Sequence, residues 1–456
     1  MATPLPAFRG RRPRRLLLSA TATAAACGLL LTGCSSEDAG GGSEFGFVAA
    51  VQDPDSAITV WVDAAREPAA AAFQAANPDI EINVETYDGG ADGSGSFQTK
   101  VSAFDQAGEG WPDVVFSTQN TDASWASQGE TPFAAVLDKG FLDDKFLSGF
   151  TPGALDPLTV DGSLYGLRND LAQNVLWYDQ SLLDEFGYEL PTTWEEYEAL
   201  GEKVAAEHPG YIVGSVGDSW APEVYFWGAK APVNQVEGVN EISVDTTDER
   251  AVKMAGILDT LIDNGTVVQD SVFGSDFVST YAGKVLLMPG PIWYSGAIFQ
   301  NPDNLASAPG TIGAGLPLAW DGEDPVTGNV GGGTWFVSSH SKNLEASKAF
   351  VEFVTSDPAY QVELSPGYPA YASAGNAWLD KQAASGFFAG DFAADVRASS
   401  GLVWEGWGYP RFSQAAIWAK TVTPELAAGA SLVDTLPAWQ TAIENEAQVN
   451  GYTVAK

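Results

Sequence analysis

Short strand-like and helix-like segments alternate in the first part of the chain, and this order constrains the fold more than any other feature. Residues 57–62 (AITVWV) and 113–117 (DVVFS) are short apolar runs rich in β-branched side chains, which are typical of buried strands. Residues 80–87 (IEINVETY) alternate polar and apolar side chains, as in a strand with one buried face. Helix-like stretches at 67–76 and 97–107 separate these runs. A β-α-β-α-β order predicts an α/β fold with a parallel sheet and helices on its faces.

A second stretch, from residue 174 onwards, carries clear helix start and stop signals. Residues 174–179 (NVLWYD) form an expected strand, and the following helix is expected to end at Gly187. Thr193 stands three residues before Glu196, which is the spacing of a capping box at a helix N-terminus. We expect this helix to run to Glu207, because His208-Pro209 ends the pattern.

The composition excludes several functional classes. The 456 residues carry 22 Lys and Arg against 59 Asp and Glu, a net charge of −37. Nucleic-acid binding needs clustered cations, so a nucleic-acid partner is excluded. The length suggests two or three domains with sizeable cores. Two His and two Cys give little scope for histidine-based metal sites and none for a disulfide framework, so we expect no metal and no cofactor.

The N-terminus reads as an export signal. A basic run (Arg9 to Arg15) precedes an apolar stretch, which ends in Leu31-Thr32-Gly33-Cys34 and resembles a bacterial lipobox. We therefore predict a signal peptide at 1–33, a diacylated Cys34, and a flexible Gly- and Ser-rich tether over 34–56. A plain secretory peptide with an incidental cysteine is the alternative, and either the general or the twin-arginine export route fits. Anchored this way, the protein would function at the outer face of the cell membrane.

Four later stretches resemble one known family. They are Leu182-Leu183-Asp184-Glu185-Phe186-Gly187 with Pro191-Thr192-Thr193-Trp194-Glu195-Glu196, then residues 281–293 (YAGKVLLMPGPIW), 331–338 (GGGTWFVS) and 341–355 (SKNLEASKAFVEFVT). Their types and order resemble bacterial extracellular solute-binding proteins of family 1, the sugar-capturing components of ABC importers. The resemblance covers most of residues 57–370 and weakens beyond.

This resemblance implies a two-lobed fold of the periplasmic-binding-protein type, in which ligand binds in a cleft between α/β lobes. It places the first lobe at 57–170 and 316–365, and the second at 171–315 and 366–456. Lobe closure would trap the solute, and membrane permease subunits would recognise the closed form. The chain would act as a monomer and would need no catalytic group.

The ligand is expected to be a sugar or an oligosaccharide. Fifteen Trp and 11% aromatic residues suit the apolar faces of sugar rings, while acidic and amide groups suit hydroxyls. The scarcity of cations favours a neutral or cationic ligand over an anionic one.

The resemblance and the expected strand ends select the candidate ligand-binding residues, and each has a structural alternative. The acidic and amide candidates could instead cap helices or form Asx-turns and hinge loops, and the Trp candidates could be core residues. The candidates are Asp63, Asn120, Asp122, Asp170 (beside Asn169), Trp220, Trp293, Trp335, Trp404 and Trp407.

Three other functions stay open from the sequence. A secreted carbohydrate-active hydrolase needs two carboxyl groups about 5–10 Å apart, which 59 acidic residues could supply. A binding protein for a non-sugar neutral or cationic solute would share the same fold. An adhesive surface lipoprotein would bind no small molecule. Sustained turnover, stoichiometric binding or no binding would distinguish these alternatives.

Overall fold

The computed structural model describes residues 45–87, 96–119 and 121–455. The predicted signal peptide, Cys34, the first part of the predicted tether and Asn120 lie outside these ranges. Within the predicted tether, the ring of Phe45 lies 5.6 Å from that of Phe141, and the Asp53 N–H donates to the Lys342 carbonyl at 2.6 Å. In the part of the chain that is described, no helix is long and apolar enough to cross a membrane.

The first sheet contains the three strands that the sequence predicted. Its order is β2 (Ile82–Thr86), β1 (Ile58–Val62), β3 (Val114–Ser117), β15 (Thr334–Val337) and β6 (Leu167–Arg168). Strands β1, β2 and β3 run parallel, as expected, so the chain segments that follow β1 and β3 emerge at the same edge. Strand β15 arrives from far along the sequence and pairs antiparallel to β3.

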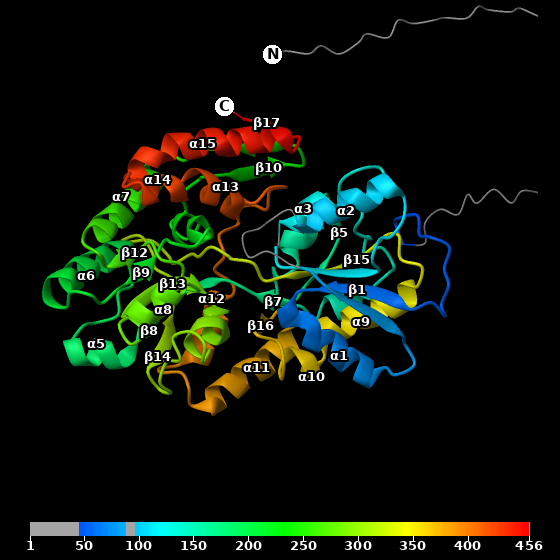
Figure 1. The fold of residues 1–456 in the computed structure, drawn as a ribbon, viewed down its shortest axis with the longest axis horizontal. Coiled ribbons are helices and arrows are strands. Elements are labelled where there is room, and N and C mark those ends of the chain that lie inside the picture. The colour runs from blue at the N-terminus through cyan, green and yellow to red at the C-terminus, as the bar shows by residue number, and fades with distance from the viewer. Residues whose placement is uncertain (1–44, 88–95, 120, 456) are drawn as a thin grey trace, which may run out of the picture. The chain divides into compact units, whose positions relative to one another are not determined.

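Helices cover both faces of this sheet (Figure 1). On one face, α1 (Glu67–Ala76) and α9 (Leu344–Ser356) pack together, and Phe350 lies 4.9 Å from Phe73 and 5.6 Å from Trp335 between ring centroids. On the other face, Phe97 of α2 (Ser96–Ala107) stacks at 5.4 Å on Phe336. Consecutive strand residues point to opposite faces, so Trp335 and Phe336 are both covered. We call this sheet with α1, α2, α9 and the short α3 (Asp122–Ala126) the first lobe.

The second lobe is built on an antiparallel sheet of β13 (Leu287–Pro291), β8 (Asn174–Asp179) and β14 (Ile312–Gly315). A parallel pair, β9 (Gly214–Ser215) and β12 (Val267–Val268), lies nearby. The predicted helix signals are confirmed: Gly187 closes α5 (Gln180–Phe186) at φ 68°, and Thr193 and Glu196 form the capping box of α6 (Trp194–Glu207). The lobe continues with α7 (Glu249–Asp263) and α8 (Ser275–Tyr281).

The C-terminal part packs largely on the second lobe. Helices α13 (Gln414–Thr421) and α15 (Leu432–Val449) contact each other, and α15 contacts α7. Strand β17 (Thr453–Val454) pairs with β11 (Glu241–Ser243), which pairs with β10 (Gln235–Gly238). The other elements are α4 (Asp144–Leu147), α10 (Pro358–Gln361), α11 (Ala372–Ser385), α12 (Phe392–Ser399), α14 (Thr423–Ala427), β4 (Thr159–Val160), β5 (Ser163–Leu164), β7 (Asp170–Leu171), β16 (Tyr368–Pro369), and the single turns Ala64–Arg66, Asp156–Leu158, Pro222–Phe226, Ser295–Phe299 and Glu405–Trp407.

The chain crosses between the lobes more than once. It leaves the first lobe through β6 and β7, and returns between β14 and β15. In this returning segment, Ala319 forms an isolated β-bridge with Thr193 of the second lobe. The Trp320 indole N–H donates to the Ala229 carbonyl, also in the second lobe, at 2.7 Å. The return to the first sheet therefore follows a stretch that contacts the second lobe. These crossings bring residues distant in sequence to the space between the lobes.

Candidate functional site

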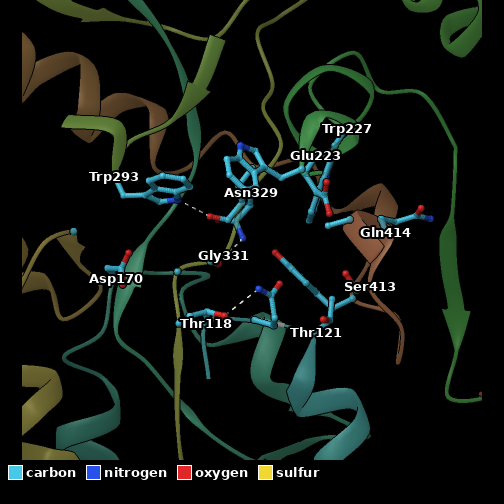
Figure 2. A pocket seen from close by; sticks show the side chains of 18 of the residues that line it. Thr118, Thr121, Asp170, Glu223, Trp227, Trp293, Asn329, Gly331, Ser413 and Gln414 are labelled. Atoms are coloured by element: carbon cyan, nitrogen blue, oxygen red, sulfur yellow. Dashed lines mark hydrogen bonds between the residues drawn. The ribbon is translucent and has the colours of Figure 1, made fainter. Parts of the chain in front are cut away.

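A cavity of about 300 Å³ lies between the lobes (Figure 2). The turn after β1 and the loop after β3 line it from the first lobe, because both strands end at that edge. The second lobe contributes the turn Pro222–Phe226 and the residues after β13. The backbone of residues 329–333 crosses the cavity wall, and residues 407–410 and 412–415 close another side.

Arg66 and Asp170 form the charged part of the first-lobe wall. Arg66 lies in the turn that Asp63 caps, and its Nη1 is 3.2 Å from Asp63 Oδ2. Its Nη2 is 4.0 Å from Asp170 Oδ1, and its guanidinium lies 4.5 Å above the Phe116 ring. Burial raises the pKa of Asp170, and Arg66 partly opposes that shift. Arg66 and Asp170 line the cavity, whereas Asp63 stands behind Arg66 and orients it.

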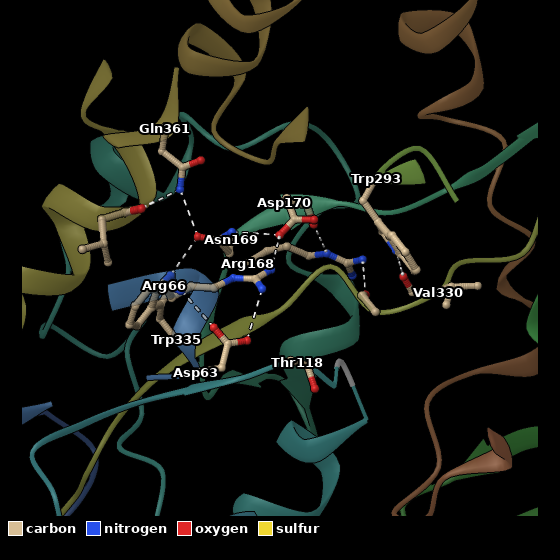
Figure 3. A network of polar contacts seen from close by, with 12 residues as sticks. Asp63, Arg66, Thr118, Arg168, Asn169, Asp170, Trp293, Val330, Trp335 and Gln361 are labelled. Atoms are coloured by element: carbon tan, nitrogen blue, oxygen red, sulfur yellow. Dashed lines mark hydrogen bonds and ion pairs between the residues drawn. The ribbon is translucent and has the colours of Figure 1, made fainter. Parts of the chain in front are cut away.

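A buried network supports this wall from behind (Figure 3). Arg168 donates to the Asp170 carbonyl at 3.0 Å, to Asn329 Oδ1 at 2.9 Å and to the Gly331 carbonyl at 3.0 Å. Asn169 donates to Asp170 Oδ1 at 2.8 Å. Burial lowers the pKa of Arg168, while hydrogen bonding with Tyr409 opposes that shift. The network fixes Asp170 and the crossing backbone in one arrangement.

Asp122 points into the protein rather than into the cavity. Its carboxylate accepts hydrogen bonds from Ser117 and from Gln98, the latter at 3.1 Å, and it is 4% exposed. Burial raises the pKa of Asp122 to about 6. Its neighbours Thr118 and Thr121 do line the cavity, so the strand end predicted from the sequence reaches the site even though Asp122 itself does not.

Two aromatic clusters form most of the apolar wall. In the first, Trp293 lies 5.8 Å from Trp220 in an edge-to-face contact and 6.2 Å from Phe273 in a nearly parallel one. In the second, Trp227 stacks on Trp407 at 5.1 Å and meets Tyr409 edge-on at 5.6 Å. All of these residues line the cavity. Of the candidates from the sequence, the structure thus brings Asp170, Trp220, Trp293 and Trp407 together.

The indole N–H groups of these walls are already used within the protein. Trp293 donates to the Val330 carbonyl at 2.9 Å, and Trp220 donates to the Tyr294 hydroxyl at 2.9 Å. Trp227 and Trp407 each donate at 2.6 Å, to the carbonyls of Trp404 and Ala231. The Trp side chains of the wall therefore present ring surface to the cavity.

Trp335 and Trp404 do not line the cavity. Trp335 is 0% exposed, packs between the sheet and α9, and donates to Asn169 Oδ1 at 3.0 Å. Trp404 is half-buried, and its carbonyl holds the Trp227 indole. Trp404 thus supports a residue of the wall directly, whereas Trp335 supports Asn169, which in turn donates to the wall residue Asp170.

The glycine run at 331–333, just before β15, allows a close approach of backbone. Gly332 and Gly333 have φ values of 100° and 58°, which favour glycine. A Cβ on Gly332 would collide with the Arg168 guanidinium, and one on Gly333 would collide with the Phe116 ring. The crossing segment can therefore lie against the first lobe and also border the cavity.

Glu223 is a site residue that the sequence analysis missed. Its carboxyl accepts a hydrogen bond from the Ala415 backbone N–H, and burial raises its pKa to about 8. Arg66 and Asn329 were missed as well. The available signal for Arg66 was its position three residues after the capping residue Asp63; Glu223 and Asn329 lie in no motif.

The residues that the structure describes contain no group of three or more His, Cys, Asp and Glu arranged to hold a metal ion. The site therefore consists of aromatic surface, amide and hydroxyl groups, one arginine and two carboxyl groups. Such a set can stack on a ligand and hydrogen-bond to it.

The curated proteins that this chain resembles include two binding proteins for saccharides. The arabinooligosaccharide-binding protein of Halalkalibacterium halodurans is 24% identical over 201 residues, which cover 42% of this chain and 44% of that protein. The lactose-binding protein of Rhizobium radiobacter is 22% identical over 305 residues, covering 66% and 68%. The match thus spans less than half the length of the first of these relatives.

Solved structures share the fold. The ABC transporter associated binding protein of B. animalis subsp. lactis, in complex with β-1,6-galactobiose, has a TM-score of 0.69 at 19% identity, covering 88% of this chain and 99% of that one. The galacto-N-biose-/lacto-N-biose I-binding protein of Bifidobacterium longum gives 0.69 at 18% identity, covering 89% and 100%. The model of the family described as bacterial extracellular solute-binding protein matches residues 59–361. The chain therefore belongs to the bacterial extracellular solute-binding protein family.

Proposed function

We propose that this protein is the substrate-binding component of an ABC importer and captures a sugar or a short oligosaccharide outside the cell membrane. The observation that carries the proposal is the interlobe cavity, in which two Trp-rich walls face polar groups such as Arg66, Asp170 and Asn329. Sugar rings offer C–H faces to aromatic rings and hydroxyls to such polar groups. Relatives that bind arabinooligosaccharides and lactose, and neighbours solved with galactobiose and lacto-N-biose, support this class of ligand.

The size of the cavity supports a small ligand. At about 300 Å³ it lies at the lower end of ligand sites, which span about 300–1,000 Å³. A mono-, di- or trisaccharide suits this space better than a polymer does.

A screen with purified protein tests the proposal. Mono- to trisaccharides are first added one at a time in a thermal-shift assay. Those that raise the melting temperature are then titrated by calorimetry. We expect at least one saccharide to bind with a stoichiometry of one and to be recovered unchanged. Sustained release of product would identify a hydrolase instead. Absence of binding to any saccharide, with binding to another neutral or cationic solute, would leave the fold but remove the sugar assignment.

We further propose that the ligand surface includes Asp170, Trp220, Trp293 and Trp407. The residues Asp63, Asp122, Trp335 and Trp404 act on it indirectly, through the partners described above. We propose that the lobes that close on the ligand comprise residues 57–170 with 316–365, and residues 171–315 with 366–456. The contacts of Ala319 and Trp320 with the second lobe favour one change, in which the chain returns to the first lobe at β15.

Membrane attachment through Cys34 is part of the same proposal. The lipobox-like sequence supports it. In a cell without an outer membrane, a lipid anchor would keep the binding protein close to the permease subunits. Detergent partitioning and mass spectrometry of the mature N-terminus test it. We expect a lipid-modified Cys34 and release of the Cys34→Ala variant into the medium; an unmodified mature N-terminus would contradict it.

A further inference from the structure

Glu223 is a half-buried acid without a cationic partner among the residues that the structure describes. It lies in the turn Pro222–Phe226, between Trp220 and Trp227 in sequence, and all three residues line the cavity. Its Oε2 atom is buried and has no hydrogen-bond partner among the residues that the structure describes. Its carboxyl accepts two backbone hydrogen bonds, from its own N–H and from the Ala415 N–H in the first turn of α13.

The cations near the cavity are already paired with other groups. Among the described residues that line the cavity, Arg66 is the only cation, and it lies between Asp63 and Asp170. Arg168 stands behind the wall and donates to Asp170, Asn329 and Gly331. Glu223 is therefore left as a carboxyl group with no matching positive charge.

The groups around Glu223 do not change this balance. The neighbouring turn of α13 contributes the uncharged Ser413, Gln414 and Ala415, and the crossing segment contributes the uncharged Asn329 and Val330. The titratable groups across the cavity are Arg66, Asp170 and Tyr409. Burial, rather than a neighbouring charge, raises the pKa of Glu223 to about 8. An empty site thus keeps this carboxyl mostly protonated at neutral pH.

A cationic ligand group would complete this arrangement. A buried carboxylate is stabilised by a hydrogen-bonded cation, and indole rings also attract cations. Trp220 and Trp227 place such rings in the same wall, with their N–H groups already committed elsewhere. An anionic ligand, in contrast, would meet Glu223 and Asp170, and the wall would offer it only Arg66, which already pairs with Asp63.

We propose that Glu223, with Trp220 and Trp227, forms a subsite for an ammonium group, so that the ligand is an amino sugar or another amine-bearing glycoside. This inference rests on the proposed function, because it names the chemical class of ligand for the same cavity. When the ammonium group binds, Glu223 loses its proton to the solvent and pairs with the ammonium as a carboxylate.

Proton release follows from this pairing. With a pKa of about 8, roughly nine-tenths of Glu223 is protonated at pH 7 before binding. Ammonium binding should then release close to one proton per ligand. A neutral sugar bound to the protonated acid should release none.

Calorimetry with matched pairs tests the inference. The probes are glucosamine with glucose, galactosamine with galactose, mannosamine with mannose, and the β-1,4-linked glucosamine dimer with cellobiose. Titrations are run at pH 7 in two buffers of different ionisation enthalpy, which gives the number of protons released. The variants are Glu223→Gln, which keeps the shape of the side chain, and Glu185→Gln, which removes one exposed carboxylate from α5.

We expect at least one amine to bind about tenfold or more tightly than its hydroxyl partner and to release about one proton. Glu223→Gln should remove both effects while Glu185→Gln keeps them. If Glu223→Gln does not fold, proton release by the wild-type protein decides the question. Equal or tighter binding of the neutral partners, or no proton release, would overturn the amine subsite and leave sugar binding intact. Absence of binding by every probe, with binding of a neutral saccharide from the wider screen, would overturn the amine subsite alone. Absence of binding by any saccharide in either experiment would overturn both proposals.

Discussion

Replacing Trp293 by Ala tests whether the aromatic wall holds the ligand. The indole is half-buried: Phe273 lies nearly parallel at 6.2 Å, Tyr294 meets it edge-on at 4.8 Å, and its N–H is bound to Val330. A ligand can therefore use only part of the ring. About a third of the roughly 200 Å² that a Trp side chain can bury leaves about 60–70 Å². At about 25 cal/mol per Å², that area is worth about 1.5–2 kcal/mol, or a 10- to 30-fold loss of affinity.

The assay is calorimetry with the tightest saccharide from the screen, accompanied by thermal melting of each variant. Trp293→Phe serves as a matched control, because it keeps a ring but loses the hydrogen bond to Val330, and its affinity should fall less than that of Trp293→Ala. A folded Trp293→Ala protein whose affinity stays within about twofold of the wild type would refute the reasoning. The wall formed by Trp220 and Trp293 would then not contact the ligand.

Three further predictions concern closure, pH and stability. Ser124→Ala removes the hydrogen bond that Ser124 of the first lobe donates to the Tyr409 carbonyl at 2.6 Å. If this contact stabilises the closed lobes, calorimetry should show ligand affinity about fivefold weaker, and unchanged affinity would exclude that role. Asp122 has a pKa of about 6 when folded against 3.8 ordinarily, so the folded state holds a proton that the unfolded chain has released, and stability falls as pH rises between these values. Urea unfolding of Asp122→Asn should therefore show its stability relative to wild type improving by about 2.5 kcal/mol from pH 4 to pH 7, whereas a pH-independent difference would contradict the shift. Thr193→Ala removes the capping box with Glu196 and should lower the free energy of unfolding by about 1 kcal/mol with ligand affinity unchanged; a loss of affinity would link α6 to the site.

Elements with strong local patterns were predictable from the sequence. Strands β1, β2 and β3 and helix α1 lie within two residues of their expected bounds, because apolar runs and side-chain alternation are local signals. The capping box at Thr193 belongs to the same class. The completion of the first sheet by β15 was not derivable from periodicity, because pairing between Thr334 and Ser117 joins segments more than two hundred residues apart.

The site was predictable only in part, for a similar reason. Trp335 follows three glycines that border the cavity, yet strand alternation turns its ring toward α9, and a sheet covered on both faces gives no sequence signal to distinguish the two directions. Glu223 becomes notable only in the folded protein, where it is packed against Ala415, which lies far along the chain. The burial that shifts its proton affinity is a property of the packed lobes rather than of any motif.

The commitment of the four indole N–H groups to protein oxygens has a consequence for selectivity. Rings held in this way recognise flat hydrocarbon patches but not the direction in which a hydroxyl points, so they should tolerate epimers that differ away from the stacked face. Stereochemical discrimination then falls to the few directional groups of the cavity, chiefly Asp170, Glu223 and Asn329. Exchanging one of these residues should re-tune which isomer is accepted, whereas exchanging one ring for another should alter how tightly every isomer is held.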